Sequence, residues 1–323
     1  MTDSDTPIVH IGYHKTASTW FQTAFYPACK GAHLVTRRNT RQAFLEPTAL
    51  AFDPAEARRT LAVPAGMRPV VCEEALVGYY GNAGLLQALS KDVAYRVRDV
   101  FPDAQVVIFI RNQLDMLAAT YLQYIRRGGT HTVRRFLYPY RHVRRYRTKA
   151  FKNPMFCLEH LDYHNLIQHY INIFGREKVH VFPYEAFRTN AGDFLKTYAA
   201  LLGLDVDVDA LSFSGTNVSY RMTTARLARL LNHVTVGDAP DSITPLPLMP
   251  RKVNEVAMRQ VNRTPLAGPK VTPERLFGRE HARELAVRYA PGNRVLTEML
   301  DVDLAGYGYP VAAAGQSAVS DAA

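Results

Sequence analysis

Near its start, the 323-residue chain carries a short segment with a glycine, a lysine and several hydroxyl side chains. The segment follows the apolar run 8–11 and leads directly into a stretch with the apolar spacing of a helix. A strand, a tight turn and a helix in this order aim backbone N–H groups and the positive helix end at one point. Further donors at that point are Lys15, Thr16, Ser18 and Thr19. The natural ligand of such a cluster is a phosphate-like anion.

A second cationic residue, Arg111, directly follows the apolar run 105–110. In P-loop nucleotide-binding proteins the corresponding strand ends in an aspartate that holds magnesium. An arginine there suits direct pairing with a phosphate and repels a divalent cation. The first loop also departs from the Gly-x4-Gly-Lys-Ser/Thr pattern, because Gly12 precedes Lys15 by only three residues and Ala17 stands in place of a second glycine. Together these departures predict a phosphate site that works without a metal ion.

Four segments carry a resemblance to a known family. Ile-Gly-Tyr-His-Lys-Thr-Ala-Ser-Thr-Trp at 11–20 resembles the 5′-phosphosulfate loop of sulfotransferases that use 3′-phosphoadenosine 5′-phosphosulfate (PAPS). Val-Ile-Phe-Ile-Arg-Asn-Gln-Leu-Asp at 107–115 is similar to their 3′-phosphate-binding strand and helix start. The segments 181–187, with Tyr-Glu, and 303–310 are also similar to family members. The resemblance spans about residues 8–310.

The resemblance implies a set of cofactor-binding residues. Lys15 would contact the leaving phosphosulfate oxygens, and Arg111 would bind the 3′-phosphate. The loop residues expected around the phosphosulfate are His14, Thr16, Ala17, Ser18, Thr19 and Trp20. PAPS would be the sulfuryl donor and 3′,5′-adenosine bisphosphate (PAP) the product, with no metal required.

One family position differs in this chain. The family usually has a serine eight residues after the arginine, as a second 3′-phosphate ligand, and Ala119 stands there. We expect the neighbouring Thr120 to take this role. The family's later basic and glycine-containing 3′-phosphate motif is not recognisable, and Asn217 and Ser219 are the polar residues considered in its place.

Transfer to an acceptor also needs a base that removes the acceptor proton. Glu74 follows the apolar run 69–72, which places it at the carboxyl edge of the expected sheet. His14, inside the first loop, is the competing candidate. The alternative interpretation of Glu74 and its neighbour Glu73 is a solvated helix start favoured by the helix dipole.

The alternation of apolar runs with helical spacing predicts an α/β protein. Short, β-branched runs predict buried parallel strands at 8–11, 69–72, 105–110 and 179–182. Helices are expected at 19–28, 84–100, 115–126, 162–174 and 191–202, the last ending at Gly203. The predicted fold has three layers, with a central parallel sheet flanked by helices as in P-loop NTPases.

We expect a single domain over residues 7–311. The proline-rich stretch 237–273 is expected to be an irregular excursion. The ends, 1–6 and 312–323, are small and polar, which predicts disorder.

The net charge of +10 has one source. Between Arg126 and Lys152 the chain has ten Lys or Arg and no Asp or Glu, so the other 29 basic residues balance the 29 acidic ones. Aromatic residues interleave with these cations. An acidic small-molecule or glycan acceptor, nucleic acid and a merely solvated surface are three interpretations. The position directly after the expected 3′-phosphate helix favours the acceptor and makes nucleic acid less favoured.

Composition also bears on where in the cell the protein is expected to be. No run approaches 18 apolar residues, which predicts no membrane span. The first residues lack the features of a signal peptide, and three widely spaced cysteines argue for buried thiols in a reducing cytoplasm.

The favoured hypothesis is sulfuryl transfer from PAPS to a hydroxyl or amine, with a carbohydrate as one candidate acceptor. A P-loop kinase or NTPase is the alternative, and a nucleic-acid-binding module is the third hypothesis. Neither the acceptor nor the oligomeric state follows from the sequence.

Overall fold

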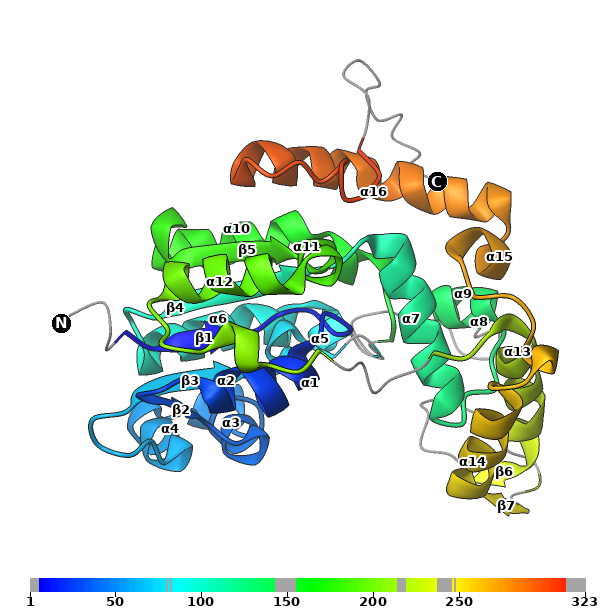
Figure 1. Cartoon of the computed structure of the whole chain (residues 1–323), viewed down its shortest axis with the longest axis horizontal. Helices are drawn as coiled ribbons and strands as arrows, with labels where there is room; N and C mark the ends of the chain where they lie inside the picture. The colour runs from blue at the N-terminus through cyan, green and yellow to red at the C-terminus, as the bar shows by residue number, and fades with distance from the viewer. Residues whose placement is uncertain are drawn as a thin grey trace. The chain divides into compact units, whose positions relative to one another are not determined.

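The computed structural model describes residues 6–79, 81, 83–142, 155–213, 219–236, 246 and 248–311, without the side chains of 83, 84, 141 and 142. The chain forms two compact units (Figure 1). One comprises 1–112, 159–214 and 289–323, and the other comprises 113–158 and 215–288. The expectation of a single domain over 7–311 stays a prediction. The expected disorder of the two ends concerns residues that, apart from Thr6, lie outside the described ones.

The first unit is built on a five-stranded parallel sheet with the order β2-β3-β1-β4-β5. Its strands are β1 (Ile8–His10), β2 (Ala32–Leu34), β3 (Arg68–Cys72), β4 (Gln105–Ile110) and β5 (Val179–Pro183). Val9 of the central strand lies opposite Val71 on one side and Val106 on the other, and all three are fully buried. The predicted parallel sheet is confirmed. The edge strand β2 was missed because it is short and only half-buried, so it has no apolar run.

Helices flank this sheet (Figure 1). The helices of the first unit are α1 (Ser18–Trp20), α2 (Tyr26–Ala28), α3 (Arg37–Phe44), α4 (Pro54–Leu61), α5 (Ala83–Leu86), α6 (Ala88–Val100), α10 (Tyr163–Phe174), α11 (Tyr184–Thr189) and α12 (Ala191–Leu202). One sheet face, with Ile8, Val107 and Phe109, packs into a core with aromatic residues of the 18–28 helix and of α12. On β4 and β5 the sheet also contacts α10, which in turn packs on α6. This is the predicted three-layer arrangement.

Two predicted helices differ in detail from the observed ones, and a third ends where it was expected to end. The helix expected at 19–28 contains a π-helical segment, Phe21–Phe25, between α1 and α2. The helix expected at 84–100 is interrupted at Gln87, which adopts φ 67°, so α5 and α6 are separate. The helix α12 ends as predicted, with Gly203 in the left-handed conformation at φ 60°.

The second unit is mainly helical. Its elements are α7 (Gln113–Arg126), α8 (Val133–Leu137), α9 (Pro139–His142), α13 (Met222–Leu231), β6 (Thr235–Val236), β7 (Met249–Pro250), α14 (Arg251–Val261), α15 (Pro273–Phe277) and the first part of α16 (Arg279–Leu300). Helix α14 corrects the expectation that 237–273 is irregular. The prolines mark its boundaries rather than its interior, since Pro250 is the residue before its first turn, where a missing N–H costs nothing.

Two expectations from composition concern the thiols and the membrane. Cys29 and Cys72 are buried thiols, and burial raises the pKa of Cys29 to about 12. Within the described ranges, none of the helices combines the length and the apolar character needed to cross a bilayer.

Candidate anion-binding site

The loop 11–17 lies directly on strand β4. The N–H groups of Ile11 and Tyr13 donate to the carbonyls of Val107 and Phe109 at 3.0 and 2.9 Å. Between them, a Cβ on Gly12 would come within 3.1 Å of the Phe109 backbone nitrogen, so only glycine fits this close approach. The loop is therefore held against the strand that ends in the predicted arginine.

The loop ends in a tight turn that starts the first helix. Lys15 and Ala17 both have left-handed backbone conformations, with φ near 66° and 68°. The Ala17 carbonyl accepts the N–H of Trp20 at 2.8 Å, which begins a continuous helical run over 18–28. The hydroxyl of fully buried Thr16 donates to the Tyr13 carbonyl, so this side chain fastens the turn. The positive end of the helix thus lies at Ser18, next to Lys15.

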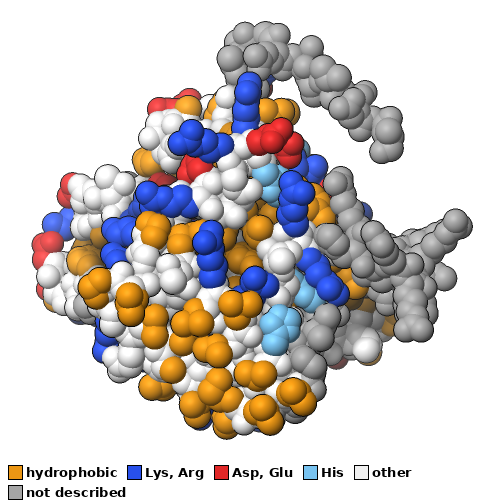
Figure 2. All heavy atoms as spheres, turned by 90° about the vertical axis from the view of Figure 1, so that its right-hand side faces the viewer, with side chains coloured by type: hydrophobic (Ala, Val, Ile, Leu, Met, Phe, Trp, Pro, Cys, Tyr) orange, Lys and Arg blue, Asp and Glu red, His pale blue; other side chains and the backbone are white. Residues whose placement is uncertain are grey.

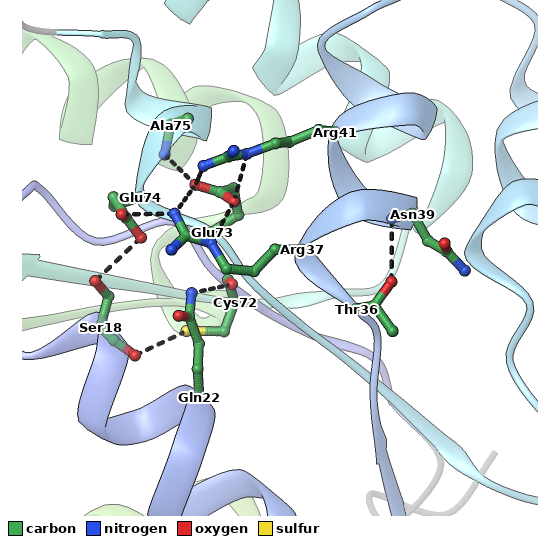
Figure 3. Close-up of polar contacts among 10 residues, drawn as sticks. All are labelled: Ser18, Gln22, Thr36, Arg37, Asn39, Arg41, Cys72, Glu73, Glu74 and Ala75. Carbon is green, nitrogen blue, oxygen red and sulfur yellow. Dashed lines mark hydrogen bonds and ion pairs between the residues drawn. The ribbon is translucent and has the colours of Figure 1, made fainter. Parts of the chain in front are cut away.

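Two glutamates after β3 form an ion-pair network with α3 (Figure 3). Arg37 and Arg41, one turn apart on α3, both donate from Nε to Glu73 Oε2 at 2.9 Å. Arg37 also donates from Nη2 to Glu74 Oε1 at 2.8 Å. Ser18 Oγ, at the helix start, donates to Glu74 Oε2 at 3.1 Å. Glu74 therefore joins the phosphate-type loop to the arginines of α3.

The two glutamates have different environments. The side chain of Glu73 is fully buried, and Glu74 keeps 16% of its side chain exposed. Burial raises the pKa of Glu73, but the hydrogen bonds from Arg37 and Arg41 outweigh it, so the pKa lies below its usual value. Glu73 is not part of a solvated helix start. It is a buried anion that fixes α3 to the end of β3, and Glu74 is the carboxylate that remains accessible.

Arg111 lies at the end of β4, beside the loop. Its Nη1 donates to the Lys15 carbonyl at 3.1 Å, and its guanidinium stands 5.2 Å from the centre of the Tyr184 ring. Within the described part of the chain, its Nε atom is buried and has no hydrogen-bond partner. An unused buried donor on a cation is costly unless a ligand accepts from it. The geometry fits an anion bound between Arg111 and the loop.

A second buried carboxylate, Glu185, holds the backbone next to Arg111 in place. Glu185 accepts the Asn112 N–H at 3.0 Å and the Tyr309 hydroxyl at 2.9 Å. Tyr163 donates its hydroxyl to the Arg111 carbonyl at 2.7 Å. Burial, and then the nearby Glu185 carboxylate, raise the pKa of Tyr309 well above its usual value, so this hydroxyl stays a donor.

This arrangement explains three of the segments noted in the sequence. Tyr184 and Glu185, Arg111 and Asn112, and the chain near Tyr309 meet at one place. Sequence reasoning had assigned no role to Glu185 or Tyr309. Their signal was present, because both belong to segments that resemble the family.

Comparisons with known proteins bear on this arrangement. The sequence matches no family model and no curated protein. Its structure is similar to the crystal structure of a sulfotransferase from Alicyclobacillus acidocaldarius, with a TM-score of 0.52 and 16% identity, over 94% of this chain and 98% of that chain. The chain has a sulfotransferase-like fold.

This similarity confirms the expected fold, a parallel α/β sheet of the P-loop-like type. A mouse sulfotransferase, SULT7A1, solved in complex with PAP, aligns with a TM-score of 0.39 and 14% identity, over 82% of this chain and 87% of that chain.

The remaining predicted site residues of the first unit are Trp20, Thr19 and His14. Trp20 donates from Nε1 to the Ser212 carbonyl at 3.0 Å, and its ring stacks on Phe213 with centres 5.5 Å apart. Thr19 is exposed at the start of α1. His14 lies edge-on to the ring of Tyr79. The roles predicted for these residues stay predictions.

The other residues predicted to bind the 3′-phosphate do not lie in the unit that contains Arg111, or lie outside the described residues. Thr120 is buried on α7 and Ala119 is half-buried beside it, and both belong to the second unit. Ser219 is exposed, and Asn217 lies outside the described residues, as does much of the basic segment Arg126–Lys152. The structure thus joins Lys15, Ser18, Glu74 and Arg111 in one unit and leaves the role of Thr120 a prediction.

The buried ion pair of Glu73 should make stability depend on pH. Because the folded-state pKa is lowered, its stabilisation is complete above the unfolded value near 4.5 and is lost as the pH falls through the folded pKa. Glu73→Gln should destabilise the protein by about 3 kcal/mol at pH 7, since two arginines lose their buried partner. Urea unfolding from pH 7 to pH 4 measures the difference in unfolding free energy between the wild type and Glu73→Gln. This difference should be constant above the unfolded pKa and should narrow below it.

The matched control is Glu56→Gln, since Glu56 is an exposed helix residue paired with Arg59. Its stability should stay close to that of the wild type. The proposed role of Glu73 would be contradicted if Glu73→Gln lost as little unfolding free energy as the control, or if its loss grew at low pH.

Proposed function

We propose that this protein transfers a sulfuryl group from PAPS to a hydroxyl or amine acceptor. The observation that carries the proposal is the buried Nε of Arg111, which has no hydrogen-bond partner among the described residues. The same guanidinium is held at the end of β4 by the hydrogen bond from its Nη1 to the Lys15 carbonyl. Lys15 and Arg111, which belong to different elements, would then both contact the bound donor. The similarity of the fold to a sulfotransferase and the segments that resemble the family support the same conclusion.

The residues of the loop fit the 5′ side of the donor. PAPS would supply an activated sulfuryl group whose leaving group is a phosphate. Lys15 and the helix start at Ser18 would stabilise the negative charge that develops on this phosphate. In kinases a magnesium ion does this work. Here the fixed positive groups of the loop would replace it.

The nucleoside side of the donor would lie toward Arg111 and Trp20. Arg111 would pair with the 3′-phosphate through its Nε, for which the described residues offer no partner. The stacked rings of Trp20 and Phe213 offer a partly exposed aromatic surface in the same unit, suited to a purine base.

Glu74 is the base that we favour for removing the acceptor proton. Its carboxylate is held beside the loop by Ser18 and Arg37, and part of it remains accessible. His14 remains the competing candidate, because it also lies in the loop. A carbohydrate or other anionic acceptor near the basic segment stays a prediction from the charge pattern.

Ligand binding separates this proposal from the kinase alternative. Calorimetry should show that PAP binds without magnesium, whereas ATP with magnesium binds poorly. Arg111→Gln should weaken PAP by about tenfold to 100-fold, the typical worth of a charge-assisted hydrogen bond. The same variant should bind adenosine 5′-phosphate, which lacks the 3′-phosphate, as the wild type does. Tight binding of ATP only with magnesium would overturn the proposal.

Lys15 is the residue most directly tied to the transfer step. Lys15→Ala should lower kcat by on the order of 100- to 1,000-fold, because a donor to the developing charge is lost. The assay follows radiolabelled sulfate from PAPS into a panel of sugar, phenol and amine acceptors. Lys30→Ala, on an exposed surface, is the control and should keep full activity. A Lys15→Ala rate above about a tenth of the wild type would remove the assignment.

A pH–rate comparison distinguishes the two candidate bases. Glu74→Gln should lower kcat by about 100-fold or more and abolish the acidic limb of the kcat/KM profile, while PAP still binds. His14→Asn should keep that limb. If Glu74→Gln has the profile of the wild type, Glu74 is not the base, and loss of the limb in His14→Asn would assign the role to His14.

A further inference from the structure

One face of the second unit carries an exposed aliphatic surface. Figure 2 shows hydrophobic side chains gathered in the lower part of this view, over the elements that Figure 1 labels α13, α14, β6 and β7. The exposed aliphatic residues of these elements and of the chain between them, here called the aliphatic face, are Leu227, Leu230, Val236, Leu246, Leu248, Val253 and Val256. Single exposed aliphatic residues are ordinary, but a group on neighbouring elements indicates a binding surface.

The opposite side of α13 and α14 is buried in the interior of the second unit. Buried Asn254 of α14 donates to Asn232 Oδ1 at 2.8 Å, and Asn232 donates to the carbonyls of Ile125 and Gly129 at 2.8 Å each. Ala228 and Met258 are buried on the same side. This network fixes which sides of α13 and α14 point inward. The aliphatic face is therefore a stable outward surface, with Leu248 75% and Val256 58% exposed.

Cations lie beside the aliphatic face. The described residues in 219–236, 246 and 248–264 contain seven Lys or Arg and one acidic residue, Glu255. Glu255 is itself paired with Arg126 at 3.1 Å and with Arg259 at 3.3 Å. Lys252, Arg263 and Arg226 are exposed. Figure 2 shows Lys and Arg side chains bordering the hydrophobic area.

We propose that this face docks on the surface of an anionic lipid bilayer. Aliphatic side chains would enter the boundary between headgroups and acyl chains, and the flanking cations would pair with anionic headgroups. Charge argues against a second copy of this chain, since a two-fold contact would bring the same cations together. Nucleic acid is disfavoured because the exposed side chains are aliphatic, whereas single-strand surfaces use aromatic rings for stacking.

Vesicle co-sedimentation of the full chain tests the proposal. The protein should bind vesicles that contain phosphatidylglycerol and should not bind vesicles of phosphatidylcholine alone. Leu248→Ser with Val256→Ser should lower binding by on the order of tenfold, because buried apolar area is lost. Lys252→Glu with Arg263→Glu should lower it by a similar factor, and added salt should weaken the wild type.

Matched controls lie in the first unit, at Leu201→Ser for exposed apolar area and Lys30→Glu for charge. Both should bind as the wild type does, and circular dichroism should show that all variants are folded. Equal binding by wild type and face variants would overturn the proposal, as would no binding to anionic vesicles. Dimerisation that Leu248→Ser with Val256→Ser abolishes, without vesicle binding, would assign the face to a second copy instead. None of these outcomes depends on the proposed sulfuryl transfer.

Discussion

The site depends on the close contact between the loop 11–17 and strand β4. Hydrogen bonds from Ile11 and Tyr13 continue the sheet pairing beyond the end of β1, and Gly12 allows the two backbones to approach. This contact brings the Lys15 carbonyl within reach of Arg111. A parallel sheet places such strand ends at one edge, where ligands bind. The loop and the arginine come from segments about 100 residues apart, so the sheet is what makes them one site.

Buried carboxylates balance the positive groups that the site needs. Glu73 holds two arginines of α3 and leaves Glu74 to contact Ser18, while Glu185 fixes the backbone beside Arg111. Both fully held carboxylates accept several hydrogen bonds, which is how a buried anion is tolerated. These buried carboxylates therefore position the groups around the site. Among the described residues, the buried Nε of Arg111 has no partner and is left for a ligand.

The sequence was sufficient for the main sheet and for the position of the loop and of Arg111 at its edge. These depend on local signals, namely apolar runs and the residues that follow them. It was not sufficient for the ion-pair network, because Arg37 lies on a polar helix whose pairing with Glu73 is set by tertiary packing. The edge strand β2 and the helix α14 were missed for related reasons. One has little apolar character, and the other is enclosed by prolines that suggested irregular structure.

Positive charge in this chain is concentrated in more than one segment, which the net charge does not reveal. The excess of +10 resides in Arg126–Lys152, yet the described part of 219–264 is also strongly basic. Among the described residues of 219–264, Glu255 is the acidic one, and it is paired with Arg126 and Arg259. Electrostatic attraction acts over about a Debye length, so local charge and not net charge decides which partner a surface meets. An aliphatic surface bordered by cations therefore keeps its own affinity for an anionic interface, whatever the acceptor in the site.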